Sequence, residues 1–121
     1  MANSYYAANL NLTNLLKDEL RTYELALFIT NPGRDGTGGT EVSAGGYGRQ
    51  TIEFGTPSVG SSFNSNEVVF SDATGDWGTV TGFGVYDDQA NLLRIGTLTT
   101  PRAIYIGDIV RFSIGAIECK E

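Results

Sequence analysis

Hydrophobic and polar residues alternate along most of the chain in short runs, which is the pattern of half-buried β-strands. In residues 79–86 the period of two places Phe83 and Val85 on one face, and Gly82 and Gly84 on the other. Glycine weakens an isolated strand, so glycines at alternate positions predict that another backbone or a large side chain lies close to that face. We expect this to be the central strand, with the other strands arranged around it.

Further runs of strand-forming residues are separated by turns rich in Gly, Pro, Asn and Asp. They are residues 23–30, 41–43, 51–54, 67–70, 92–99, 103–106 and 109–114. The run 23–30 is apolar on both faces, which is typical of a strand inside a sheet or beneath a helix. About eight short strands of this kind predict an all-β fold, an antiparallel, jelly-roll-like β-sandwich, with a small barrel as the alternative.

The same alternation identifies the side chains that should form the core. We expect Leu25, Leu27, Phe83, Val85, Phe112 and Ile114 to be buried. In the run 109–114, Val110 shares the inward face with the last two, whereas Arg111 and Ser113 point outwards.

One segment follows the period of a helix instead. Leucines recur at every fourth position from Leu12 to Leu20, with charged residues among them. This spacing predicts a short N-terminal amphipathic helix over residues 12–20, with Asn11 or Thr13 as its N-cap. A helix this short is unstable on its own, so we expect it to dock on the sheet.

Residues 1–9 show no clear periodicity. We expect them to form a flexible N-terminal arm on a single β-sandwich domain that spans residues 1–121. Tyr5 and Tyr6 lie on this arm. Because adjacent tyrosines combine a large apolar body with a polar tip, we identify them as a candidate interface with a partner subunit. The alternative is that they fold back on the chain's own sheet.

The composition excludes several classes of function. The chain has no histidine and one cysteine, Cys119, which removes Ser-His-Asp and Cys-His nucleophiles and any internal disulfide. We expect Cys119 to act as a half-buried small hydrophobic residue. A net charge of −6, with few and scattered basic residues, argues against nucleic acid as a partner. No apolar run reaches the roughly 18 residues that would cross a membrane, so no membrane partner is expected.

Five aspartates in three places remain as candidates for chemistry. They are Asp72 with Asp76, Asp87 with Asp88, and Asp108. Aspartate is a common turn residue, and none of these positions shows the spacing of a calcium-binding loop, so we interpret them as turn residues. We therefore expect no metal, no cofactor and no catalytic residue. A glycosidase-like carboxylate pair stays open, since its geometry is set in three dimensions.

Several segments, taken in order, point to a known family. They are residues 25–33, 39–50, 76–87, 96–102 and 107–108, within a span of roughly residues 10–117. In sequence and spacing they resemble a family of small virion proteins of tailed bacteriophages, described as head decoration or tail fibre proteins. The resemblance implies a non-enzymatic structural protein with a jelly-roll-like sandwich. It also implies a symmetric oligomer located in the virion, which is assembled in the bacterial host cytoplasm.

Long tail fibres have a repetitive shaft and a separate attachment domain, and this chain shows neither. We therefore expect a capsid decoration, or cement, protein that binds the phage major capsid protein and stabilises the head shell. The alternatives are a tail fibre, tail-tip or receptor-binding module bound to tail proteins and, less favoured, a small glycan-active enzyme. Because a specific interface buries over about 1,000 Å² in total, we expect copies to associate as a homotrimer at local three-fold positions.

Overall fold

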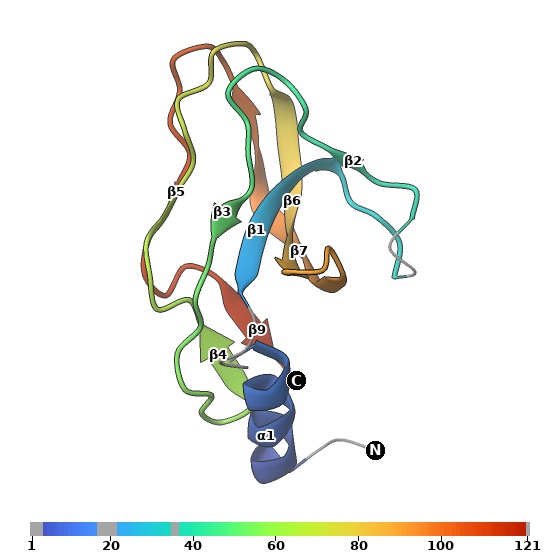
Figure 1. Ribbon diagram of the computed structural model, residues 1–121, viewed down its shortest axis with the longest axis vertical. Helices are drawn as coiled ribbons and strands as arrows, with labels where there is room; N and C mark the ends of the chain where they lie inside the picture. Colours follow the sequence, from blue (N-terminus) through green and yellow to red (C-terminus); the bar gives the residue numbers. More distant parts are fainter. Residues whose placement is uncertain (1–3, 17–21, 35–36, 121) are drawn as a thin grey trace.

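The computed structural model describes residues 4–16, 22–34 and 37–120. Its elements are α1 (Tyr5–Leu16), β1 (Tyr23–Thr30), β2 (Thr40–Glu41), β3 (Gln50–Thr51), β4 (Ser61–Phe63), β5 (Val68–Val69), β6 (Gly78–Asp87), β7 (Leu92–Ile104), β8 (Arg111–Phe112) and β9 (Glu118–Lys120). In Figure 1, α1 lies at one end of the molecule beside β4 and β9. The turns that precede β6 and follow β7 lie at the opposite end.

The main sheet has the order β2-β1-β6-β7, and β3 pairs with the same edge of β1 as β2 does. All of its pairings are antiparallel, and the β1–β6 ladder sets Leu25 opposite Val85 and Leu27 opposite Phe83. Two smaller antiparallel pairs, β4–β9 and β5–β8, complete the β-structure. The expected all-β, sandwich-like antiparallel fold with one short N-terminal helix is confirmed, and β6 is an interior strand as predicted.

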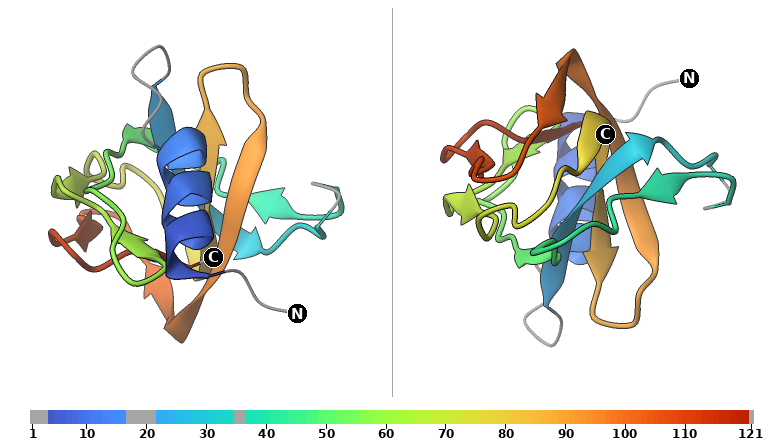
Figure 2. Two further views of the ribbon diagram at one scale, coloured as in Figure 1. Left: turned by 90° about the horizontal axis from the view of Figure 1, so that it is seen from below. Right: turned by 90° about the horizontal axis from the view of Figure 1, so that it is seen from above.

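One hydrophobic core joins the main sheet, the smaller strand pairs and the helix. It contains Leu12 and Leu16 from α1, Leu25 and Leu27 from β1, and Val85 from β6, among others. Viewed along the long axis, α1 covers one end of the strands (Figure 2). The helix is docked as predicted, but on the small β4–β9 pair rather than on the main sheet. Burial of Leu12 and Leu16 provides the stabilisation that so short a helix lacks alone.

The expected core is confirmed in β1 and β6 and wrong at Ile114, which lies beyond the end of β8. Leu25, Leu27 and Val85 are fully buried. Phe83 and Phe112 are partly buried and pack against the core. Ile114 is 68% exposed, because β8 ends at Phe112 and the chain then turns, with the Ala116 N–H donating to the Ser113 carbonyl. The alternation in the sequence therefore continues two residues beyond the strand.

The helix begins earlier than the sequence suggested. It starts at Tyr5 rather than at residue 12, and its N-cap is Ser4 rather than Asn11 or Thr13. The Ser4 hydroxyl accepts a hydrogen bond from the Ala7 N–H at 3.2 Å, as an N-cap serine does. The remainder of the predicted helix, residues 17–20, lies outside the described residues.

Gly82 and Gly84 of β6 have the close neighbours that were predicted. A Cβ at Gly84 would lie 2.6 Å from the Phe28 ring and 2.9 Å from Leu92. At Gly82 the Asn31 side chain crosses the bare strand and donates a hydrogen bond to the Gly96 carbonyl at 3.3 Å. The absence of a side chain on this face of β6 lets residues from both neighbouring strands meet over it.

Strand β7 is longer than predicted. Residues 92–99 and 103–106 were expected as two strands, but Leu92–Ile104 form one strand that continues through Pro101. In the β6–β7 ladder Gly82 pairs with Thr97, but Val80 pairs with Arg102. Strand β7 therefore contains extra, unpaired residues at this irregularity. Proline lacks an N–H, and it is tolerated here because β7 is the edge strand of the sheet.

Candidate interaction surface

The predicted interface residues, Tyr5 and Tyr6, lie in the first turn of α1. The flexible arm expected over residues 1–9 is therefore wrong from Tyr5 onwards, whereas residues 1–3 lie outside the described residues. Both tyrosines remain open to solvent, with Tyr5 65% and Tyr6 79% exposed. Leu10, one helical turn after Tyr6, is 47% exposed and extends the same apolar side of the helix.

A tight turn from another part of the chain packs beside this helix. Ser58 and Ser61 exchange backbone hydrogen bonds of 2.8 and 3.0 Å, which leaves Val59 and Gly60 as a two-residue loop. The Gly60 N–H donates to the Asn9 side chain at 2.8 Å. A Cβ on Gly60 would lie 3.6 Å from the Tyr5 ring, so the turn and the first part of α1 form one continuous surface.

Val59 has an unusual backbone conformation. Its φ is +52° and that of Gly60 is +74°, the combination of a type I′ turn. Asn-Gly is the preferred sequence for such a turn, and a β-branched residue is one of the least favoured at positive φ. The Val59 side chain is nevertheless 63% exposed, so burial within this chain does not compensate for the strain.

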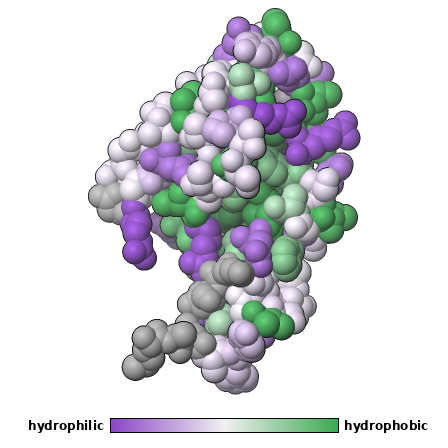
Figure 3. Space-filling model, turned by 180° about the vertical axis from the view of Figure 1, so that it is seen from behind, coloured by the Kyte–Doolittle hydropathy of each residue, from purple (hydrophilic) through white to green (hydrophobic). Residues whose placement is uncertain are grey.

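The two segments that meet here carry no charge. None of the lysine, arginine, aspartate and glutamate residues of the chain falls within residues 4–16 or 54–66. We call these two segments together the neutral surface. From behind the molecule, the end formed by α1 shows mainly pale or hydrophobic side chains, and the most hydrophilic ones lie higher, over the sheet (Figure 3).

A polar cluster lies between β2 and β3 along the edge of β1. Tyr47 accepts a hydrogen bond from the Leu27 N–H at 3.0 Å, and its hydroxyl donates to the Glu41 carboxylate at 2.5 Å. Arg49 donates to both oxygens of the same carboxylate, at 2.8 and 3.0 Å. The guanidinium lies 3.8 Å from the centre of the Tyr86 ring, a cation–π arrangement.

The electrostatics of this cluster fix its protonation state. Burial raises the pKa of Glu41, but hydrogen bonds from Arg49 and Tyr47 outweigh that effect and hold the pKa below its ordinary value. Burial and the adjacent Glu41 raise the pKa of Tyr47 well above its ordinary value. At neutral pH the carboxylate is therefore ionised and the phenol protonated, so both hydrogen bonds persist. The cluster explains how this edge is closed and supplies no reactive group.

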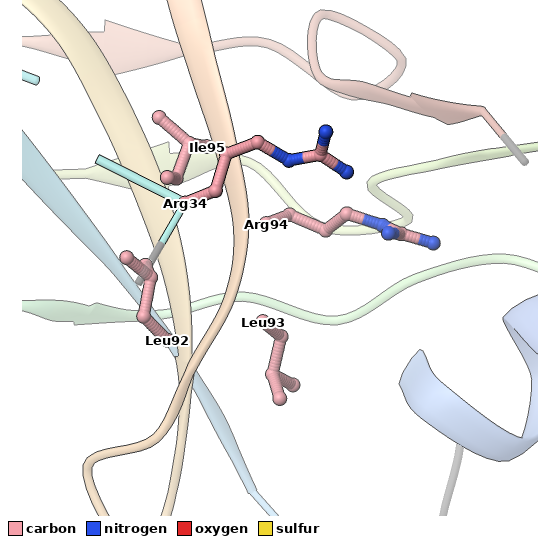
Figure 4. Close-up of a pocket in the computed structure, with 5 residues that line it drawn as sticks. All are labelled: Arg34, Leu92, Leu93, Arg94 and Ile95. Carbon is pink, nitrogen blue, oxygen red and sulfur yellow. The ribbon is translucent and has the colours of Figure 1, made fainter. Parts of the chain in front are cut away.

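Two arginines that are far apart in sequence line one hollow beside β7, and the sequence did not predict that they would meet. Arg34, Leu92, Leu93, Arg94 and Ile95 line a hollow of about 340 Å³. In Figure 4 both guanidinium groups extend to the same side of β7. Arg34 arrives there because Asn31 fixes the chain after β1 to β7. The basic residues are scattered in sequence, yet the fold brings Arg34 and Arg94 to the same hollow.

Asp87 and Asp108 have the turn roles that we inferred, whereas Asp76 accepts a hydrogen bond from the distant Ile106 N–H at 3.0 Å. The Asp87 carboxylate accepts hydrogen bonds from the Gln89 and Asn91 N–H groups, both at 2.9 Å. Asp108 accepts one from the Tyr105 N–H at 2.8 Å. Among the described residues, no group of three or more potential metal ligands lies close enough to hold an ion.

Cys119 is more deeply buried than predicted, with 5% of its surface exposed. Burial raises the pKa of the thiol to about 11, so it stays protonated and unreactive near neutral pH. No described helix is both long and apolar enough to pass through a bilayer.

These features describe a small all-β protein with exposed, uncharged side chains on α1 and on the Val59 turn. Comparison with protein families identifies it further. The family described as podophage GP4 fiber I protein gp80 matches residues 3–120, nearly the whole chain. The chain belongs to this family and is a structural protein of a phage virion. Comparison with curated proteins gave no match.

Proposed function

We propose that the protein is a non-enzymatic subunit of a virion fibre, held in the particle by contacts with its own copies and with neighbouring tail proteins. The family match over residues 3–120 carries this proposal, because the family description refers to a fibre protein. The exposed, uncharged side chains of α1 and of the Val59 turn support it, since uncharged aromatic and aliphatic groups are typical of contact surfaces.

A capsid decoration protein is the second candidate. It is favoured by the sandwich-like β-fold built around one hydrophobic core, because a compact unit of this kind suits a cap or cement subunit better than it suits a repetitive shaft. In this role a homotrimer would bind the major capsid protein at local three-fold positions and stabilise the shell. Both candidates place the protein in the virion, and they differ in the number of copies that each particle needs.

A glycan-active enzyme is the least supported reading. It would rely on Asp87 and Asp88, but Asp87 is 5% exposed and its two carboxylate oxygens accept hydrogen bonds from residues of its own turn. A carboxylate held in this way is poorly placed to reach a substrate. We therefore assign no catalytic residue.

Copy number in purified virions tests the proposal. Quantitative mass spectrometry, normalised to the major capsid protein, should find far fewer copies of this chain than of capsid protein if it belongs to a fibre. A copy number comparable to that of the capsid protein would replace the fibre by the decoration role. Absence from particles that remain infectious would overturn both.

A further inference from the structure

We propose that the neutral surface binds the neutral surface of a second copy of this chain. The inference deepens the proposed function, because a fibre subunit must meet its own copies, and it concerns where they meet. It is carried by three observations: the exposed apolar side chains of α1, the absence of charge in both segments, and the strained but exposed Val59.

The charge distribution favours a second copy of the chain as the partner. Each chain carries a net charge of −6, so two copies repel one another over most of their surfaces. Residues 4–16 and 54–66 hold no charged side chain, and they are brought together by the Gly60–Asn9 hydrogen bond and the Gly60–Tyr5 contact. The strand paired with β4 carries Glu118 and Lys120, which have opposite signs, so two copies can approach here with little net repulsion between like charges.

A different partner would favour a different surface. An acidic chain can bind a basic protein most readily through its carboxylates, which raise both the rate and the specificity of association. The neutral surface offers none of them. It offers Tyr5, Tyr6, Leu10 and Val59, and aromatic and aliphatic side chains of this kind can pack against the same set on a symmetry-related copy.

Val59 shows where the contact falls. The described residues with positive φ, other than glycines, are Val59 and Ala90, and of the two only Val59 is β-branched. Asparagine would fit the type I′ turn better, yet the chain carries an apolar side chain that is mostly exposed. An exposed valine in a strained conformation gains nothing within one chain. It gains burial once a second copy covers it.

Two opposite effects of one substitution test the inference. Val59→Asn creates the Asn-Gly sequence that type I′ turns prefer, so we expect the monomer to melt a few degrees higher. The same change should weaken self-association about ten- to a hundredfold, the loss that corresponds to removing one buried valine-sized side chain. Tyr6→Glu should weaken it as well, by placing a charge in the contact. Tyr105→Glu, at a tyrosine that is 60% exposed and follows the last residue of β7, is the matched control.

Sedimentation from micromolar to millimolar concentration, with melting curves of each variant, gives both readouts. We expect the wild-type chain and Tyr105→Glu to form an oligomer whose mass is a multiple of 13.0 kDa, a homotrimer among the possible states. Val59→Asn and Tyr6→Glu should remain folded and shift towards monomer. A wild-type chain that stays monomeric throughout would overturn the inference, as would equal dissociation constants for all four proteins. Either failure leaves the copy number in virions unchanged, so the assignment to a fibre is tested separately from the self-contact.

Discussion

The hydroxyl group of Tyr47 should stabilise the fold by replacing a missing strand partner. The Leu27 N–H points to the edge of β1 where the chain between β2 and β3 leaves the ladder, and it donates to the Tyr47 hydroxyl at 3.0 Å. Tyr47→Phe keeps the ring packed against Trp77 and Phe70 but leaves this N–H without its partner. It also removes one of the hydrogen bonds to Glu41.

The expected cost follows from the loss of that partner. Leaving a buried donor unsatisfied costs about 1–3 kcal/mol, and we take about 1–2 kcal/mol because Tyr47 is only partly buried. The entropy of unfolding near the midpoint is roughly 2.1 cal/mol/K per residue, or about 0.25 kcal/mol/K for this chain. Tyr47→Phe should therefore lower the melting temperature by about 4–8 °C.

Urea unfolding followed by tryptophan fluorescence is a direct assay for this variant. Trp77 is the only tryptophan of the chain, is buried, and packs edge-on against Tyr47 with the ring centres 5.5 Å apart. Tyr105→Phe, at a tyrosine that is 60% exposed, is the control and should change stability by less than about 0.5 kcal/mol. If Tyr47→Phe were as stable as the control, the hydroxyl would not be the partner that closes this edge.

Three further predictions rest on packing and protonation. Gly84→Ala should destabilise the fold by about 1–3 kcal/mol, because its Cβ would meet the Phe28 ring, whereas Gly48→Ala has open space and should be nearly neutral in the same urea titration. The wild type should have a larger free energy of unfolding than Glu41→Gln at every pH above the ordinary glutamate pKa of 4.5. This difference should disappear as the pH falls through the lowered pKa of Glu41 in the folded state, which unfolding measured as a function of pH would show. Cys119 should resist iodoacetamide at pH 8 in the folded protein and react fully in urea, and rapid labelling without denaturant would contradict its burial.

Local pattern was sufficient to predict the strands that lie in the middle of the sheet. Strand β1 has the predicted bounds because its apolar run is long and ends at Asn31-Pro32-Gly33. The paired glycines of β6 correctly indicated large neighbours, since bare positions in a strand require a tertiary cause.

Features that depend on tertiary contacts were missed. The alternation continues to Ile114, but a turn ends β8 before it. The N-terminal helix was placed late, because its buried residues Ala8, Leu12 and Leu16 begin with a small side chain that leaves little periodic signal. Strand β7 crosses Pro101, which only its edge position permits.

The candidate surface was predicted only in part. The pair Tyr5 and Tyr6 was singled out as a candidate interface, but we expected these residues on a flexible arm, whereas they lie in α1. Val59 carries no signal of its own in the sequence, because positive φ in a Val-Gly turn is set by the hydrogen bonds between Ser58 and Ser61. The position of Arg34 beside Arg94 depends on Asn31, which crosses β6 to reach β7.

Location on the particle tests the central claim most directly. Antibodies against this chain, labelled with gold and imaged by electron microscopy on intact purified virions, should mark projecting fibres and leave the faces of the capsid unlabelled. Labelling distributed evenly over the capsid, with none on the fibres, would contradict the assignment of this protein to a virion fibre.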